Sequence, residues 1–331
     1  MKKISILFII AIFAFGILVG CQSSASQSAD GNSEATKNTA EESTAENKTD
    51  IEKTITVTDA RGEVEIPANP KKIVDLSGNS DILSVLGYSV VGTANSDAYD
   101  YTKFPSYLEK TLKGAKILGY SMQDTMDIEG ILELEPDLII ISSVQEKMYD
   151  QLKEVAPTVM VELAQINWKD DINAFAKIMD KEEKASKWLK EYETKAQEKG
   201  KEIKEKYGEN TTYLAMLASG GQLYVFDSAG IGSILYEDMG LKKPENMPEQ
   251  ENISLPVITY EGLAEIDADY MVIVGTDEDM SSLKKNSIYK NMRAVKDENV
   301  IELPSSPYFN MGYSCIGRNL FLDEFFSLME K

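Results

Sequence analysis

The sequence predicts an α/β protein of two similar lobes, each with a central, mostly parallel sheet, joined by one long α-helix. The first observation is an internal repeat, because EGILELEPDLIII begins at Glu129 and EGLAEIDADYMVI begins at Glu261. A repeat of this length indicates two lobes rather than a solenoid. The second is an alternation of β-branched runs with short helical stretches, which is typical of parallel strands with right-handed crossovers. The third is a highly charged segment, Lys169–Tyr207, with apolar residues at helical spacing.

The first fifty residues indicate export. A Lys-Lys pair precedes the apolar run Ile4–Val19, the pattern of a secretory signal. The run ends in Leu-Val-Gly-Cys, which resembles the lipobox of bacterial lipoproteins, where the cysteine is diacylated. We expect a signal peptide over 1–20 and a disordered, polar tether over 21–50 on a lipidated Cys21. An ordinary signal peptide with an incidental cysteine is the alternative.

The first lobe is expected over residues 51–165. Runs of Thr, Ile and Val on either side of an Asp-Ala-Arg-Gly turn predict a hairpin, and later β-branched runs predict buried strands. The expected hairpin strands are Thr54–Thr58 and Glu63–Ile66, the sheet strands are Ile73–Leu76, Val90–Gly92, Leu138–Ile141 and Thr158–Val161, and the helices are Asp81–Leu86, Ile128–Leu134 and Met148–Val155.

A linker over residues 166–207 contains the long amphipathic helix, and the alternation then resumes in a second lobe over 208–331. The expected strands there are Thr212–Leu217, Leu223–Phe226, Tyr270–Val274 and Val300–Leu303, and the expected helices are Ile231–Met239 and Phe321–Met329.

Composition narrows the function. The net charge of -21 argues against nucleic acid as a partner. Histidine is absent, which removes Ser-His and Cys-His catalytic couples and histidine-bearing metal sites, and no residue set suggests an enzyme. Only three arginines occur, so a site built from several guanidinium groups for an anionic ligand is disfavoured. Apart from Cys21 the only cysteine is Cys315, which we expect to be a small buried residue.

Five segments together carry a family resemblance: TVTDARGEVEIPANPKKIVDL, EPDLIII, VAPTVMVE, KIMDKEEKASKW and NMRAVKDENVIELP. In order and spacing they resemble the iron-chelate branch of the substrate-binding lipoproteins of bacterial ABC importers, especially the ferric-hydroxamate binders. The resemblance implies the class III periplasmic-binding-protein fold and a ferric siderophore, a hydroxamate, bound between the lobes. It further implies that Glu129 and Glu261 dock into arginine pockets of a permease heterodimer or homodimer. A monomer is expected, touching the membrane only through Cys21, and the long tether favours a Gram-positive surface.

The ligand site is expected in loops at the strand ends that face the other lobe. By resemblance, Tyr224 matches a tyrosine that contacts hydroxamates and Phe309 matches a cleft tryptophan. The loops add the further candidates Trp168, Tyr308, Tyr120, Asn79, Ser143 and Tyr313, within wider segments that include Tyr99–Tyr101. Aromatic side chains suit a bulky, partly apolar chelate.

One departure from the family bears on the cargo. Relatives often place an arginine in the loop after the Tyr224 strand, but here this loop reads FDSAGIG. A neutral or cationic chelate met by hydroxyls and backbone amides would fit. The iron would stay inside the chelate, so we expect no cofactor and no protein ligand to a metal. Haem held by Tyr or Met, or a corrinoid, is the alternative cargo, and an enzyme or a non-transport surface lipoprotein is the alternative class.

Overall fold

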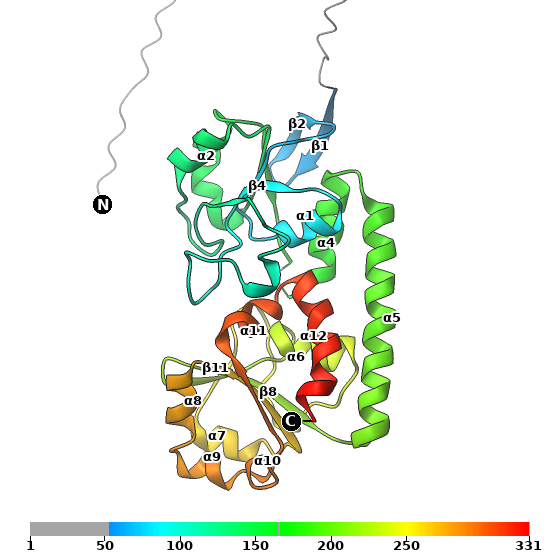
Figure 1. Ribbon diagram of the computed structural model, residues 1–331, viewed down its shortest axis with the longest axis vertical. Coiled ribbons are helices and arrows are strands. Elements are labelled where there is room, and N and C mark those ends of the chain that lie inside the picture. The colour runs from blue at the N-terminus through cyan, green and yellow to red at the C-terminus, as the bar shows by residue number, and fades with distance from the viewer. Residues whose placement is uncertain (1–52, 165, 331) are drawn as a thin grey trace, which may run out of the picture. The chain divides into compact units, whose positions relative to one another are not determined.

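The computed structural model describes residues 53–164 and 166–330. The predicted signal peptide, the lipidated Cys21 and the tether lie outside these residues. Two α/β lobes follow one another along the described chain, and a long helix, α5, runs beside both (Figure 1). The predicted fold class is therefore confirmed. No helix in the described part combines the length and apolarity that crossing a membrane requires.

The first lobe contains a wholly parallel sheet with the strand order β5-β4-β3-β6-β7. β6 is apolar over its first four residues, as expected of a strand that is buried on both faces. An antiparallel hairpin, β1–β2, attaches to β7, where the Ala60 N–H donates to the Met160 carbonyl oxygen (3.0 Å). The strands are β1 (Thr54–Asp59), β2 (Gly62–Pro67), β3 (Ile73–Asp75), β4 (Val90–Thr93), β5 (Lys116–Ile117), β6 (Leu138–Ser142) and β7 (Thr158–Val161), and the helices are α1 (Ser80–Val85), η1 (Ser106–Leu108), α2 (Ile128–Leu134), η2 (Ser143–Met148) and α3 (Tyr149–Leu152).

The second lobe has the corresponding order β10-β9-β8-β11-β12, but its sheet is mixed. β8, β11 and β12 are parallel, whereas β9 returns antiparallel to β8. Gly220 and Gly221 connect β8 to β9 with φ of 57° and 75°, a tight-turn conformation that favours glycine. The strands are β8 (Tyr213–Ser219), β9 (Gln222–Val225), β10 (Val257–Ile258), β11 (Tyr270–Gly275) and β12 (Val300–Pro304), and the helices are α6 (Gly230–Ser233), the π-turn η3 (Ile234–Asp238), α7 (Tyr260–Glu265), α8 (Asp277–Leu283), α9 (Ser287–Asn291), α10 (Arg293–Lys296), α11 (Ser305–Met311) and α12 (Cys315–Leu328).

Two helices connect the lobes, α4 (Trp168–Ile178) and α5 (Glu182–Tyr207). At 1.5 Å per residue, the 26 residues of α5 extend about 39 Å. Gly200 of α5 approaches the Met239 carbonyl so closely that a side chain would not fit between them. The later part of the linker is thus one helix, as predicted, and it packs against the second lobe.

The sequence repeat is a structural repeat. Asp127 caps α2 by accepting from the Gly130 N–H (2.9 Å), and Thr259 caps α7 in the same way from the Gly262 N–H (3.0 Å). The aspartate just before the strand in each copy ties two neighbouring strands together. Asp137, before β6, accepts from the backbone before β3, and Asp269, before β11, accepts from the backbone before β8.

The lobes share one hydrophobic core. A single buried cluster continues from β3 through α4 and α5 to β11 and α12, and it includes Ile73, Phe175, Tyr192, Val272 and Phe321. Two smaller clusters lie on the other faces of the sheets, one under α2 and α3 and one under α7 to α10. Because the larger cluster crosses the junction, moving one lobe against the other would disturb packed side chains.

Candidate functional site

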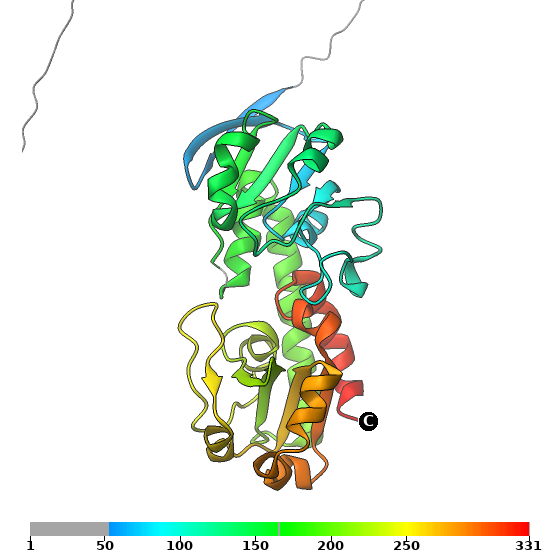
Figure 2. The same cartoon turned by 90° about the vertical axis from the view of Figure 1, so that its left-hand side faces the viewer.

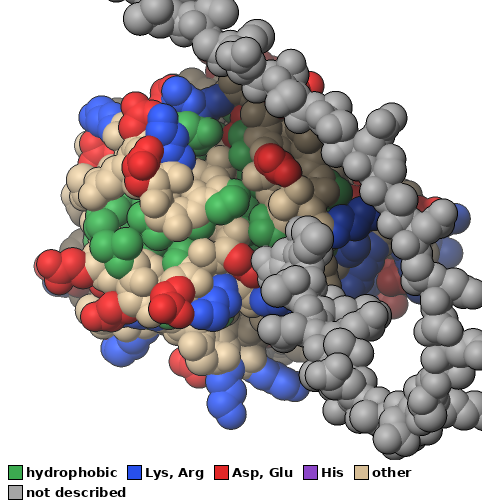
Figure 3. All heavy atoms as spheres, turned by 90° about the horizontal axis from the view of Figure 1, so that it is seen from above, with side chains coloured by type: hydrophobic (Ala, Val, Ile, Leu, Met, Phe, Trp, Pro, Cys, Tyr) green, Lys and Arg blue, Asp and Glu red, His purple; other side chains and the backbone are tan. Residues whose placement is uncertain are grey.

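The repeated glutamates occupy matching positions on the surface. Glu129 and Glu261 are each the second residue of their helix, two positions after the capping residue, and both are exposed. The helices that carry them, α2 and α7, lie on the left of Figure 1, on the side away from α5. Seen from the outer end of the first lobe, hydrophobic side chains form a patch bordered by acidic and basic ones (Figure 3).

Several hydrogen bonds join the first lobe to α11 and to the start of α12 in the second. The Ser314 hydroxyl donates to the buried Asp81 carboxylate, and the Ser306 hydroxyl donates to the buried Asp97 carboxylate, both at 2.6 Å. The Ala98 N–H donates to Oδ1 of Asn310 (3.0 Å). The two acids were not among the predicted site residues, and they hold the lobes in register.

Asp75, at the end of β3, organises the loop that carries Asn79. The carboxylate is fully buried and accepts from the Ser77 and Ser80 hydroxyls (2.5 and 2.6 Å) and from the Asn79 N–H (3.0 Å). Burial raises the pKa of the Asp75 carboxyl, although these hydrogen bonds act in the opposite direction. The Asn79 amide in turn donates to the Ser77 carbonyl (3.2 Å), so this predicted residue is already held by its own loop.

Gln145 fixes a second loop of the first lobe. Its fully buried amide donates to the carbonyls of Ser121 (2.7 Å) and Gln123 (3.0 Å), directly after Tyr120. Ser143 lies exposed at the start of η2, beside this contact. Two predicted residues, Tyr120 and Ser143, are therefore close to the same anchor.

Aromatic side chains from both lobes meet between these loops and α11. Tyr99 of the first lobe contacts Phe309 of the second edge-to-face, with ring centroids 5.9 Å apart, and Phe309 lies 5.4 Å from Tyr313. Tyr101 stacks on Tyr120 at 4.6 Å. We call these five side chains the interlobe aromatic cluster. Tyr99 and Tyr101 are its exposed members, at 38% and 47%.

Burial raises the pKa of three tyrosine hydroxyls in this cluster. It raises the pKa of Tyr120 to about 12 and also raises the pKa values of Tyr99 and Tyr313. Near neutral pH these groups are phenols that can donate hydrogen bonds. Among the described residues, no group of three or more carboxylates and thiols is placed to hold a metal.

The other predicted aromatic residues point elsewhere. The Tyr308 hydroxyl donates to Glu324 of α12 (3.0 Å), and the Tyr224 hydroxyl donates to Gln222 of its own strand (2.6 Å). Trp168 is 7% exposed, and the guanidinium of Arg318 lies 4.8 Å above its ring. The structure therefore brings together Tyr120, Phe309 and Tyr313, but places Trp168 and Tyr308 against the helices.

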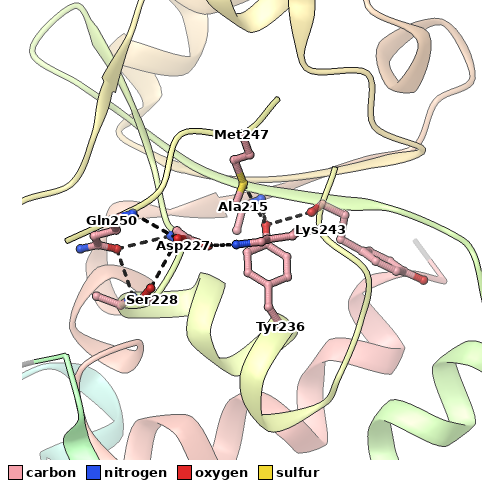
Figure 4. A network of polar contacts seen from close by, with 9 residues as sticks. Ala215, Asp227, Ser228, Tyr236, Lys243, Met247 and Gln250 are labelled. Carbon is pink, nitrogen blue, oxygen red and sulfur yellow. Dashed lines mark hydrogen bonds and ion pairs between the residues drawn. The ribbon is translucent and has the colours of Figure 1, made fainter. Parts of the chain in front are cut away.

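The loop after β9, where relatives often carry an arginine, is held by an internal acid. Asp227 is buried and accepts from Lys243 Nζ (2.9 Å) and from the Gln250 N–H (3.1 Å), while the Gln250 side chain accepts from the Ala229 N–H (3.1 Å) (Figure 4). This network fastens the loop to the long segment before β10, drawn in yellow in Figure 2. Lys243 is thus already paired with Asp227 within the protein.

Two lobes around a shared core, with loops of both lobes converging on one aromatic cluster, define a bilobal ligand-binding protein. The chain belongs to the periplasmic binding protein family, whose model matches residues 77–307. It is 30% identical over 318 residues to the probable siderophore-binding lipoprotein YfiY of Bacillus subtilis, covering 91% of this chain and 90% of that protein. It is 31% identical over 281 residues to the iron(3+)-hydroxamate-binding protein FhuD of the same organism, covering 82% and 86%. Staphylococcus aureus SirA, solved in complex with staphyloferrin B, matches with a TM-score of 0.67 and 26% identity, covering 84% of this chain and 99% of that chain.

Proposed function

We propose that this chain is a lipid-anchored extracytoplasmic receptor that binds a ferric siderophore of the hydroxamate type and delivers it to an ABC permease. The interlobe aromatic cluster carries the proposal, because it offers apolar ring surface and neutral hydroxyl donors where the lobes meet. The names of the two curated relatives support the cargo class. Binding and handover, rather than a reaction on the cargo, are the activity proposed.

The arginines favour a chelate without net negative charge. Arg61 pairs with Glu146, Arg293 pairs with Asp267 and Asp269, and Arg318 pairs with Asp238. Because each guanidinium already has a carboxylate partner, a trianionic chelate would have to be bound by lysines or backbone amides. A ferric trihydroxamate has no net charge, so it suits the neutral phenols of the cluster better than a trianionic chelate does.

The ring contacts of the interlobe aromatic cluster bear on the alternative cargo. Tyr120 stacks on Tyr101 and Tyr313 packs beside Phe309, so these tyrosines offer ring faces to a ligand. We therefore favour a chelate that already satisfies its iron. The remaining ligand candidates, Asn79, Ser143, Trp168, Tyr224 and Tyr308, stay predictions.

Chelate titration tests the function. The chain from Ile51 onward, followed by tryptophan emission, is titrated with a ferric trihydroxamate, a ferric tricatecholate, ferric citrate, haem and cobalamin. We expect saturable binding of the trihydroxamate and weaker or absent binding of the others. If none of the five ligands binds, the receptor function is wrong. If the tricatecholate binds most tightly, the charge argument is wrong although the receptor function stands.

Truncating Phe309 tests the site. We expect Phe309→Ala to weaken trihydroxamate binding at least about tenfold, because the side chain joins Tyr99 to Tyr313 and large aromatic contacts dominate binding energies. The matched control is Phe326→Ala on α12, whose ring contacts Lys206 and Tyr207 instead. Equal affinities of the two variants would place the ligand away from the interlobe aromatic cluster.

Anchoring and docking complete the proposal. A diacylated Cys21 would hold the receptor on the outer face of the membrane, which agrees with the word lipoprotein in the name of YfiY. Glu129 and Glu261 would then bind basic sockets on the two permease subunits. Such pairs at the rim of an interface contribute register and steering more than affinity.

A further inference from the structure

We propose that Asp97 is a positioning residue of the ligand site, because its one carboxylate holds the two segments whose rings, Tyr99 and Phe309, meet across the lobes. The inference rests on the proposed function, since it takes the interlobe aromatic cluster as the surface that receives the chelate. Asp97 is 2% exposed, so it would act through these rings and would not bind the chelate itself. Its task is to present both rings before the ligand arrives.

On the first lobe, Asp97 shapes the loop that carries Tyr99. Its Oδ1 accepts from the Tyr99 N–H (2.8 Å), and its own N–H donates to the Lys103 carbonyl oxygen (2.8 Å). These two hydrogen bonds close residues 97–103 into a compact loop with Asp97 at its base. The carboxylate therefore sets the backbone of Tyr99, although the Tyr99 side chain is among the exposed members of the cluster.

On the second lobe, the same carboxylate holds α11 beside Phe309. Its Oδ2 accepts from the Ser306 hydroxyl (2.6 Å), three residues before Phe309. The Ala98 N–H, the next one in the loop, donates to Oδ1 of Asn310 (3.0 Å), directly after Phe309. Contacts from one loop thus bracket Phe309 on both sides along the chain.

The other side of α11 is fixed by backbone packing. A Cβ atom added to Gly312 would lie 2.7 Å from the backbone of Gly230, so the end of α11 lies directly against the start of α6. α11 is therefore held between α6 and the loop of Asp97. Removing the Asp97 carboxylate would release one of these two sides and let the Phe309 ring move relative to Tyr99.

The positions of the rings matter for affinity. A preformed pair of rings favours binding because its side chains need no ordering when the ligand arrives. The two oxygens of Asp97 make one hydrogen bond to each lobe, and hydrogen bonds to a charged acceptor are stronger than those between neutral groups. Because one carboxylate makes both bonds, its loss should loosen both rings together.

Chelate titration of Asp97 variants tests this. With purified full-length protein and a ferric trihydroxamate, we expect Asp97→Ala to weaken binding about tenfold, because the ligand must then order both rings. Asp97→Asn should retain most of the affinity, since its amide oxygen can accept from the Tyr99 N–H and its amide nitrogen can donate to the Ser306 hydroxyl oxygen. The matched control is Asp150→Ala on α3, which removes an exposed aspartate paired with Lys153 and should leave the affinity unchanged.

A double-mutant cycle separates positioning from a general effect on the fold. In the Phe309→Ala background, Asp97→Ala should weaken binding only about threefold or less, because only the Tyr99 ring then remains to be positioned. An equal loss in both backgrounds would overturn the inference, since Asp97 would then not act through Phe309. If Asp97→Ala does not fold, Ser306→Ala enters the same cycle, because it removes only the bond to the second lobe.

Failure of the proposed function would look different. If the unaltered protein does not bind the ferric trihydroxamate, the receptor function is wrong, and the inference is wrong with it. If the unaltered protein binds the chelate and Asp97→Ala binds it equally well, only the inference is wrong.

Discussion

Replacement of Arg318 by methionine is expected to destabilise the fold by about 3–5 kcal/mol, because it leaves an uncompensated buried charge. Arg318 is 2% exposed, and its Nη1 lies 3.0 Å from the Asp238 carboxylate, whose side chain is 3% exposed. The Arg318 Nη2 also donates to the Ser233 hydroxyl (2.6 Å). Without the guanidinium, Asp238 would retain the Tyr192 hydroxyl (2.7 Å) and a lysine at 3.8 Å. Urea unfolding of the chain from Ile51 measures the loss.

The matched control is Arg293→Met. Arg293 also pairs with two carboxylates, but its side chain is 44% exposed, so the loss should be about 1 kcal/mol or less. Combining Arg318→Met with Asp238→Asn should recover part of the stability, because no unpaired charge then remains. A loss as small for Arg318→Met as for Arg293→Met would show that the buried pair does not hold the lobe junction together.

Local sequence signals predicted the long and the fully buried elements well. The helix Ile128–Leu134 and the strand Thr158–Val161 have the predicted bounds, because cap, apolar face and β-branched run all agree there. The direction of β9 was not predicted, since an apolar run does not state which way a strand runs beside its neighbour. Helices α8 to α11 were not predicted either, because each is a short segment of at most seven residues that lies outside the repeat, and the repeat was the signal for α2 and α7.

The sequence predicted which loops form the candidate site, but it did not predict which way their side chains point. Tyr308 and Phe309 are adjacent on α11 and therefore project about 100° apart, one toward Glu324 and the other toward Tyr99. Trp168 was predicted for its place at the lobe junction, and the structure buries it under Arg318, a contact between residues far apart in sequence. Asp81 and Asp97 gave no signal, because acids paired across an interface look like any other acids in sequence.

Reversing the charge of both repeated glutamates is expected to abolish uptake while leaving chelate affinity unchanged. In Glu129→Arg with Glu261→Arg, two like-charge contacts would face the basic sockets of the permease, and each such contact costs several kcal/mol of binding. Neither residue is among the contacts of the interlobe aromatic cluster, and both lie exposed on the first turns of α2 and α7. Uptake of an iron-loaded trihydroxamate by cells carrying the variant, beside titration of the purified protein, separates the two effects.

Glu191 and Glu198 provide the matched control, since both are exposed on α5, on the side of the molecule away from α2 and α7 (Figure 1). Reversing both of these charges changes the net charge by the same amount as the docking variant, but it places no arginine at positions 129 and 261. If overall charge causes the loss of uptake, uptake will also be lost in the control variant. If only the Glu129 and Glu261 variant fails, position rather than charge count explains the loss. Loss of chelate affinity in that variant would mean that the two glutamates face the ligand and not the permease.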